Sequence, residues 1–310
     1  MAKFIQFNTQ DLIPREWKHV PAPVRVFNPT LIRNNSHWIM AYRLVGEDQK
    51  RRIALCSLND NFEVVVNSTV AFSDYISGVN RDWFADPRLY KLKDKFYIYW
   101  NTGWHEPRNY QYLQAIDPLT YLPMGSVFEM NVKVNQNPLE KNWMFFGDSL
   151  EYTVYSINPH RILSSNMSEN GSSMEDLCTT TWDNLDFEKK SGKLRGGAPP
   201  QLIAGEYFSI CHTVTGTENN YIYSAACYSF SAVYPFKPTR KPSSSLLLPN
   251  PKRGSREYPK LNAAVGEVIY PCGAIYENGL WYISYGINDE TCAIAILEHE
   301  VLLASTTKIA

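Results

Sequence analysis

Short hydrophobic runs separated by polar turns alternate along the whole chain. The runs at residues 64–72, 95–100, 152–157, 206–212, 220–230, 280–286 and 292–297 are rich in β-branched and aromatic residues, a composition typical of strands. Polar or glycine-bearing turns lie between paired runs at residues 33–37, 91–95, 146–151, 204–206 and 277–279. No long stretch repeats apolar residues with the 3.6-residue period of an amphipathic helix. The pattern therefore predicts an all-β protein.

A longer unit, made of a short strand, a polar turn and an aromatic strand, recurs five times. Its copies span residues 28–43, 86–101, 140–159, 198–214 and 270–286. Alignment on Pro29, Pro87, Trp143, Pro199 and Pro271 gives steps of 58, 56, 56 and 72 residues. Such a step is too long for a helical repeat and fits a four-stranded blade with long loops. Because blades do not fold separately, we predict one five-bladed β-propeller domain over residues 1–310, with blades starting near residues 28, 86, 141, 198 and 271.

Three segments depart from this regular pattern. Residues 164–176 and 237–260 are polar, and the second is rich in Pro, Ser and Lys and accounts for the 72-residue step. Both are expected to be loops inserted at the rim. The apolar segment 292–305 is expected to supply closing strands, since propellers often join their two chain ends within one blade.

Charge, cysteine content and the lack of certain motifs limit the partners, location and cofactors that the sequence predicts. Thirty basic and 31 acidic residues leave a net charge of −1, which argues against nucleic acid or an anionic membrane as the partner. The N-terminal segment has no long apolar run, so neither a signal peptide nor a membrane span is predicted. Six scattered cysteines without a CxxC pair are typical of reduced, buried thiols in a cytoplasmic protein. No metal-binding or nucleotide-binding motif appears, so neither a metal nor an organic cofactor is expected.

Propeller geometry predicts where the functional residues meet. The first strand of each blade lines the central channel, so residues near the starts of these strands converge from distant positions. Nine polar residues are expected within reach of one pocket: Arg43, Asp86, Arg88, Lys141, Asn142, His160, Arg195, His212 and Asp289.

The order and spacing of the motifs around these residues resemble one enzyme family. The motifs are Tyr42-Arg43, ADPR at 85–88, EKNW at 140–143, INPHRI at 157–162, RGGAPP at 195–200 followed by His212, and PCG…YG…D at 271–289. Over residues 28–289 the chain resembles glycoside hydrolase family 130, the inverting β-mannoside phosphorylases with their hydrolase and mannosyltransferase relatives. The resemblance implies an enzyme that cleaves or forms a β-mannosidic bond and binds a small sugar or oligosaccharide, with mannose 1-phosphate as a candidate substrate.

The resemblance also implies roles for single residues. Asp86 would be the general acid, passing its proton through the 3-hydroxyl of the substrate. Departure of a sugar needs such a donor, and burial raises the pKa of a carboxyl toward neutrality. The plainer alternative is that Asp86 caps an Asp-Pro turn. The residues implied in sugar binding are Arg43, Arg88, Asn142, His160 and Asp289. The alternative is an inter-blade ion pair for Arg43 and Arg88, and an Asn-Asp turn for Asp289.

The nucleophile decides the reaction. By resemblance Lys141, Arg195 (or Lys193 in its place) and His212 would bind inorganic phosphate as a co-substrate, which favours phosphorolysis or glycosyl transfer. Solvated rim charges or structural ion pairs are the alternative. An inverting hydrolase instead needs a second carboxylate roughly 6.5–9.5 Å from the acid. The candidates for it are Glu106, Glu140, Glu267 and Glu290, and none is singled out.

Two further hypotheses stay open. Ala85, Lys141 and Thr213 depart from the family pattern, which keeps open a catalytically silent propeller that binds glycans as a scaffold. A transferase that uses a nucleotide sugar or a sugar phosphate is the other. Aromatic platforms for sugar rings are expected among Trp83, Trp104, Trp143 and Tyr110, with blade packing as the alternative, which is preferred for Trp143.

Overall fold

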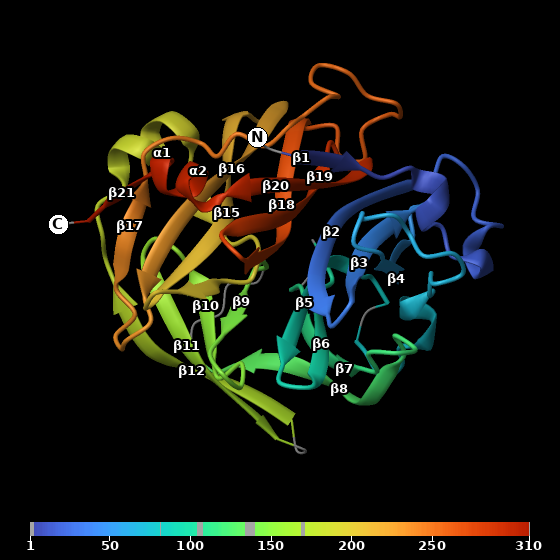
Figure 1. Cartoon of the computed structure of the whole chain (residues 1–310), viewed down its shortest axis with the longest axis horizontal. Helices are drawn as coiled ribbons and strands as arrows, with labels where there is room; N and C mark the ends of the chain where they lie inside the picture. The colour runs from blue at the N-terminus through green and yellow to red at the C-terminus, as the bar shows by residue number, and fades with distance from the viewer. Residues whose placement is uncertain (1–2, 81, 104–107, 134–139, 169–170, 310) are drawn as a thin grey trace.

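Antiparallel hairpins follow one another around the molecule from the N-terminus to the C-terminus (Figure 1). The structure is a computed structural model and describes residues 3–80, 82–103, 108–133, 140–168 and 171–309. Strands dominate these residues, with only two short α-helices, α1 (Leu185–Ser191) and α2 (His299–Ala304). Three 3₁₀ turns are η1 (Thr9–Leu12), η2 (Arg15–Trp17) and η3 (Phe72–Tyr75). The predicted all-β class is confirmed.

The described strands form three hydrogen-bonded sheets. The three-stranded sheet contains β2 (Arg25–Asn34), β3 (His37–Val45) and β4 (Arg51–Leu58). The eight-stranded sheet contains β5 (Ala85–Leu92), β6 (Lys95–Asn101), β7 (Gln111–Ile116), β8 (Pro123–Val132), β9 (Met144–Phe146), β10 (Tyr152–Ser156), β11 (His160–Ser168) and β12 (Gly171–Thr180). The ten-stranded sheet contains β1 (Lys3–Gln6), β13 (Leu194–Arg195), β14 (Gln201–Ile203), β15 (Glu206–Thr217), β16 (Asn220–Ser231), β17 (Pro238–Pro242), β18 (Val265–Glu277), β19 (Leu280–Ile287), β20 (Thr291–Glu298) and β21 (Thr306–Lys308).

Each of the five sequence repeats forms one antiparallel hairpin. The hairpins are β2–β3, β5–β6, β9–β10, β14–β15 and β18–β19. Residues from the first strand of every hairpin line a common cavity of about 500 Å³, among them Leu31, Leu89, Phe145, Leu202 and Ala274. The first strands of all five repeats therefore border one central space.

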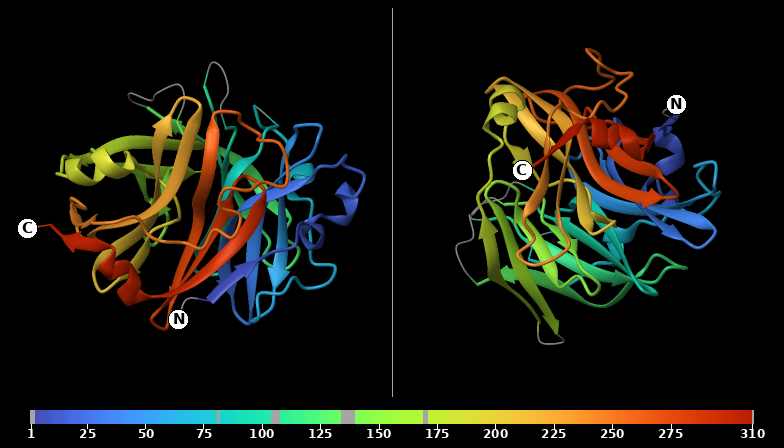
Figure 2. Two further views of the ribbon diagram at one scale, coloured as in Figure 1. Left: turned by 90° about the horizontal axis from the view of Figure 1, so that it is seen from above. Right: turned by 60° about the vertical axis from the view of Figure 1, so that its left-hand side comes forward.

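The two ends of the chain join in one sheet, as the apolar C-terminal segment predicted. Strand β1 pairs with β20 in antiparallel register, Lys3 opposite Ile296 and Gln6 opposite Ala293. Figure 2 shows these two strands side by side from two further directions. The rest of the segment forms α2 rather than another strand, and β21 after it pairs with β17.

Two local predictions were wrong. Residues 164–176, expected as a loop, lie in the long β11–β12 hairpin, where Ser165 pairs with Met174. The fully buried Met174 packs in the core beside Leu163, which anchors an otherwise polar pair of strands. Residues 64–72, expected as a strand, make only isolated bridges at Val64 and Val70. Both bridges are to β4, at Leu58 and Leu55, but they do not extend into a continuous ladder, and Val66 is 83% exposed.

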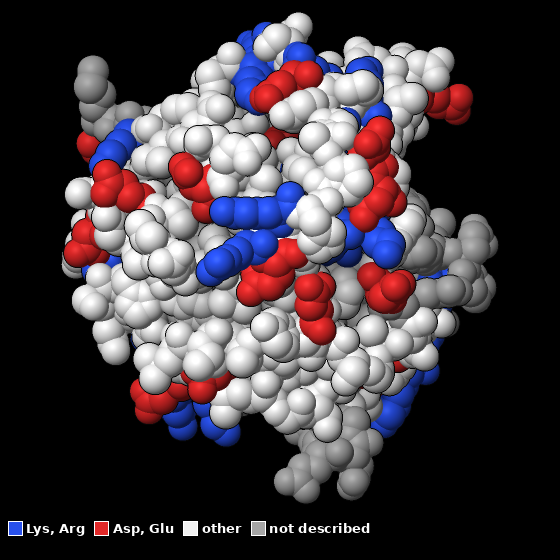
Figure 3. All heavy atoms as spheres, turned by 90° about the vertical axis from the view of Figure 1, so that its right-hand side faces the viewer, with Lys and Arg blue, Asp and Glu red and all other residues white. Residues whose placement is uncertain are grey.

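The segment at residues 237–260 contains β17 and otherwise lacks regular structure, close to its prediction as a loop. On the face shown in Figure 3, Lys and Arg side chains are interspersed with Asp and Glu, without a patch of one sign. Among the residues that the structure describes, no helix is long and apolar enough to cross a membrane.

Candidate functional site

Asp86 lies at the start of β5, where the backbone leaves regular strand geometry. Its φ is +52°, and the pairing with β6 shifts register between Ala85 and Arg88. Asn28, at the start of β2, repeats this arrangement with φ +54° and a register shift before Thr30. A bulge re-aims a side chain that regular pleating would direct elsewhere. The Asp86 residue is 1% exposed, so the bulge points its carboxylate into the protein.

Four side chains from three other repeats surround the Asp86 carboxylate. Oδ1 accepts hydrogen bonds from Asn28 Nδ2 at 2.8 Å and from Arg43 Nη1 at 3.4 Å. Oδ2 accepts from Lys141 Nζ at 3.1 Å and from the Tyr270 hydroxyl at 3.5 Å. Arg43 and Lys141 thus form ion pairs with a carboxylate whose side chain is only 2% exposed.

These neighbours determine the charge of Asp86. Burial by itself would raise the pKa of the carboxyl, but the charges of Lys141, Arg43 and Arg88 outweigh it, and the hydrogen bond from Asn28 acts in the same direction. The net effect holds the pKa of Asp86 well below its ordinary value. In the unliganded protein Asp86 is therefore a carboxylate at neutral pH.

Arg88 connects the repeats beneath this carboxylate. The guanidinium is fully buried and donates from Nη1 to the Asp86 carbonyl at 3.2 Å, from Nη2 to Asn142 Oδ1 at 3.3 Å, and from Nε to the Gly197 carbonyl. Asn142 Oδ1 also accepts from the Tyr270 hydroxyl at 2.5 Å. The Arg88 donors are thus directed at the protein, which makes this residue a brace for the site. Its partners are carbonyl and amide oxygens, not the inter-blade carboxylate that was the alternative to sugar binding.

The predicted anion-binding residues lie on the side of Lys141. Arg195 on β13 pairs directly with His212 on β15. The buried His212 ring lies 4.6 Å from the Tyr270 ring, and Lys141 Nζ lies 5.8 Å from that same ring. Burial, and then the charges of Lys141, Arg195 and Arg88, lower the pKa of His212 well below its ordinary value, so the imidazole is neutral. Its Nδ1 has no hydrogen-bond partner among the described residues.

Asp289 adds a second carboxyl to the same region. It follows β19 in a turn with φ +58° and is partly exposed. Burial of the carboxyl raises its pKa; the charges of Arg43 and Lys141 oppose this, and that of Asp86 adds to it, so the net shift is upward. The pKa values of Asp86 and Asp289 therefore shift in opposite directions, downward for Asp86 and upward for Asp289.

His160 lies elsewhere. It begins β11 and is 1% exposed, with Nε2 3.4 Å from the Tyr228 hydroxyl and its ring 4.9 Å from that of Phe230. Burial lowers its pKa to about 3. These contacts put His160 in the core between β11 and β16, and none of its described contacts is with Asp86.

Sequence reasoning missed Asn28 and Tyr270, although the repeat contained the signal. The five repeats were aligned on four prolines and Trp143, and the residues that directly precede these five positions are Asn28, Asp86, Asn142, Ala198 and Tyr270. Four of these five are polar, and those four are joined by hydrogen bonds in the site. Tyr223 on β16 was missed as well; it is half-buried, with its ring 5.8 Å from that of His212.

The remaining candidates have other partners. Trp143 is fully buried beside Tyr155, which fits its preferred role in packing. Trp83 packs against the Arg51 guanidinium at 4.0 Å, and Tyr110 against Arg108 at 4.9 Å. Trp104 and Glu106 lie outside the described residues. Glu267 pairs with Arg253 at 3.5 Å, the carbonyl of Glu140 accepts from Asn109, and Glu290 is bound by a neighbouring loop.

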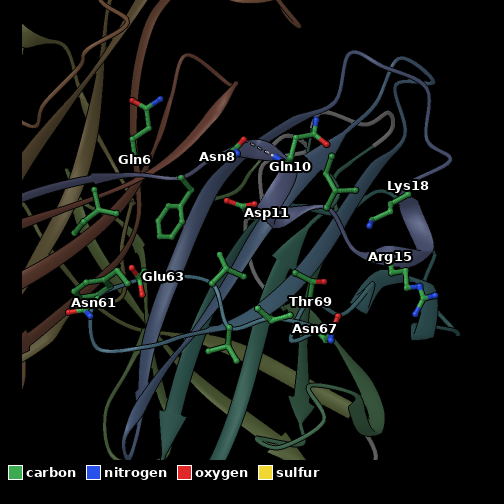
Figure 4. A pocket seen from close by; sticks show the side chains of 17 residues that line it. Gln6, Asn8, Gln10, Asp11, Arg15, Lys18, Asn61, Glu63, Asn67 and Thr69 are labelled. Carbon is green, nitrogen blue, oxygen red and sulfur yellow. Dashed lines mark hydrogen bonds between the residues drawn. The ribbon is translucent and has the colours of Figure 1, made fainter.

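One large cavity among the described residues lies away from this chemistry. It measures about 930 Å³ and is lined by the N-terminal segment and residues 61–69. Figure 4 shows acidic and basic side chains around it, among them Asp11, Glu63, Arg15 and Lys18. It contains none of the predicted site residues, and across the described ranges no three His, Cys, Asp or Glu side chains gather as metal ligands.

Comparisons with known proteins identify the family and the fold of the chain. The family model for β-1,4-mannooligosaccharide phosphorylases, glycoside hydrolase family 130, matches residues 4–307. No curated protein matches the chain by sequence. The structure is similar to β-1,2-mannobiose phosphorylase from Listeria innocua in complex with β-1,2-mannobiose, with a TM-score of 0.66, 14% identity, and coverage of 97% of this chain and 98% of that one.

Two other solved structures widen the range of activities in this fold. One comes from work on glycoside hydrolases of the same family that target β-1,2 mannosidic linkages in Candida mannan, with a TM-score of 0.63, 15% identity and coverage of 96% and 94%. The other is a mannose phosphorylase from Leishmania mexicana in complex with a phosphate ion, with a TM-score of 0.50, 11% identity and coverage of 93% and 87%.

Proposed function

Because this chain belongs to glycoside hydrolase family 130, whose members are glycoside phosphorylases or hydrolases, we propose that it is an inverting β-mannoside phosphorylase. We further propose that the five hairpins are the inner parts of five propeller blades around the shared central cavity. The observation that carries the functional proposal is the excess of cations around one buried carboxylate, with Lys141 in an ion pair with Asp86.

Phosphate suits this arrangement better than water. Lys141 keeps 25% of its side chain exposed while its Nζ contacts Asp86, so this cation is not closed off from solvent. Arg195 is exposed beside it, and the neutral His212 offers a hydrogen bond from the same wall. The mannose phosphorylase from Leishmania mexicana, which binds phosphate, supports this assignment. Arg43 and Asp289 are assigned to the sugar hydroxyls on the other side of Asp86.

The charge state of Asp86 gives the anion a second role. A general acid must carry a proton, whereas Asp86 is ionised while Lys141 and Arg43 pair with it. A phosphate bound to Lys141 would draw that cation away and add negative charge, and both changes raise the pKa of Asp86. The co-substrate therefore prepares the acid for proton transfer.

The proposed step balances in atoms and charge. A phosphate oxygen attacks the anomeric carbon as the glycosidic bond breaks, and the proton of Asp86 reaches the departing sugar oxygen through the 3-hydroxyl. The products are mannose 1-phosphate and the shortened sugar. The proton that hydrogen phosphate loses on becoming an ester restores Asp86.

The test runs this reaction in reverse. Purified protein is incubated with mannose 1-phosphate and a panel of free sugars and mannosides, and phosphate release is measured for the unaltered protein and for Asp86→Asn. We expect acceptor-dependent release, absent in a folded Asp86→Asn variant. An active Asp86→Asn variant would rule out the mechanism. Hydrolysis of mannosides without phosphate would point to a hydrolase, and silence in both assays to a glycan-binding scaffold.

A further inference from the structure

The turn that carries Asp289 joins β19 to β20. Asn288 and Asp289 are consecutive residues with φ of +56° and +58°, and the Glu290 amide donates to the Ile287 carbonyl at 3.0 Å. Two successive residues with left-handed backbone form the type I′ turn that tight β-hairpins favour, and Asn and Asp tolerate this conformation better than most residues. The loop at residues 250–260 contacts this turn and is attached to it at two points.

The Asn288 side chain is the first attachment of this loop. Its Nδ2 donates to the carbonyls of Lys252 at 3.2 Å and Ser255 at 3.3 Å. Its Oδ1 accepts from the Val268 amide at 3.0 Å. Arg256 adds a bond from Nη1 to the Asn288 carbonyl at 2.7 Å and another from Nη2 to the Gly266 carbonyl. The turn residue before Asp289 is thus fastened by both its side chain and its carbonyl.

Glu290 is the second attachment, on the other side of Asp289. Its side chain is 1% exposed, and its carboxylate accepts from the backbone amides of Glu257 at 3.1 Å and Tyr258 at 3.3 Å. Lys252 Nζ and Arg256 Nη1 lie 3.8 Å and 3.9 Å from the same carboxylate. A buried carboxylate with backbone donors and two nearby cations is firmly oriented.

We propose that Glu290 is a positioning residue: together with Asn288 and Arg256 it attaches the 250–260 loop to the β19–β20 turn and thereby fixes Asp289 in the site. The loop belongs to the segment that lengthens the last repeat step to 72 residues, so the added chain would serve to orient a carboxyl. The role of Asp289 toward a sugar rests on the proposed function, whereas the attachment itself does not.

A double-mutant cycle separates positioning from general support of the fold. Glu290→Gln keeps the shape but turns an amide N–H₂ toward backbone N–H donors. If Asp289 contacts the sugar equally in the ground and transition states, Glu290→Gln should raise KM for the sugar about 10-fold with little change in kcat. In an Asp289→Ala background the same substitution should change KM by less than about 2-fold, because the residue through which it acts is gone. Equal effects in both backgrounds would overturn the proposal.

A matched control lies in the loop itself. The Glu257 side chain is exposed and pairs with Lys252 at 3.1 Å, so Glu257→Gln makes the same chemical change without touching the turn. Its KM should stay within about 2-fold of the unaltered protein. An effect as large as that of Glu290→Gln would contradict a specific role for Glu290.

Hydrogen exchange tests the attachment without any activity. In Glu290→Gln, amide exchange should speed up about 10-fold or more both in residues 254–260 and in residues 286–291, since local opening exposes these amides. Glu257→Gln should leave both segments unchanged. Faster exchange in the loop alone would show that Glu290 fastens the loop without positioning Asp289, and would overturn the proposal. If the unaltered protein shows no turnover, the proposed function fails, and the exchange result still decides the inference.

Discussion

Replacement of Lys141 by Met tests the central ion pair of the site. Lys141 Nζ lies 3.1 Å from Asp86 Oδ2, and their side chains are 25% and 2% exposed. An opposite charge at this range lowers the pKa of a carboxyl by about 1–3 units. One pKa unit corresponds to about 1.4 kcal/mol. Because Arg43 remains beside Asp86 and Lys141 is partly solvated, Lys141→Met should reduce the free energy of unfolding by about 1–3 kcal/mol at pH 7.

The pH dependence of this loss has a definite sign. Asp86 has a lower pKa in the folded than in the unfolded state, so its contribution to stability is complete above the unfolded value of about 3.9 and is lost as pH falls through the folded pKa. Lys141→Met raises the folded pKa. Its penalty should therefore be constant near neutral pH and shrink as pH falls through the raised pKa of Asp86 in the variant.

Urea unfolding of the unaltered protein, Lys141→Met, Asp86→Asn and the double variant at pH 7 gives the coupling free energy directly. The control cycle combines Lys241→Met with Asp183→Asn, a pair 3.9 Å apart whose side chains are 35% and 72% exposed. We expect a coupling of about 1–3 kcal/mol for the first pair and about 0–1 kcal/mol for the second. Equal couplings in the two cycles would refute the idea that Lys141 keeps Asp86 ionised.

Three further predictions concern the same network. Arg88→Lys keeps the charge but loses the guanidinium group that donates to Asn142 and to two backbone carbonyls. It should lower the free energy of unfolding, measured in urea, by about 2–4 kcal/mol, and a loss below about 1 kcal/mol would contradict a bracing role. Phosphate at 100 times its Kd should stabilise the protein by about 2.7 kcal/mol, seen as a raised Tm, and equal shifts in Arg195→Ala would exclude that residue from the anion site. Gly286→Ala would place a Cβ 2.1 Å from Asn28 Oδ1 and 2.9 Å from the Asn28 backbone nitrogen, and it should therefore destabilise the protein by about 1–3 kcal/mol and reduce kcat. Unchanged kinetics would contradict the proposal that the Asn28 hydrogen bond to Asp86 matters for activity.

The hairpins could be predicted from sequence because their signals are local. Alternating apolar residues and polar turns define β5–β6 almost to the residue, and they define the β18–β19 hairpin except that β18 begins earlier, at Val265. The errors arose where a partner decides the outcome. Residues 64–72 have strand composition but meet β4 only at isolated bridges, whereas the polar residues 164–176 become strands because β11 and β12 pair along their whole length. Composition does not contain that information, since strand propensity depends on context.

The site was predictable to the extent that the repeat was. Converging strand starts correctly brought together Arg43, Asp86 and Lys141 from three repeats. His160 was wrongly predicted to lie in the site. It begins β11, which is not the first strand of a hairpin repeat, but in sequence the start of β11 looks like the start of such a first strand. The bracing role of Arg88 could not be predicted from the sequence either, because two of its partners are backbone carbonyls that come close to it only in the folded chain.

The contrast between Asp86 and Asp289 shows that the chemistry of this site is shared among the repeats. Asp86 belongs to the second repeat, but its ionised state depends on Arg43 from the first and Lys141 from the third. Asp289 belongs to the fifth, and burial raises its pKa while Glu290 and Arg256 restrain its turn. A substitution in one repeat therefore changes the protonation of a residue in another, without altering the strand that carries it. Strand β1, which precedes the first repeat, pairs with β20, which follows the fifth, so this pairing links the chain segments next to the repeats that carry Arg43 and Asp289.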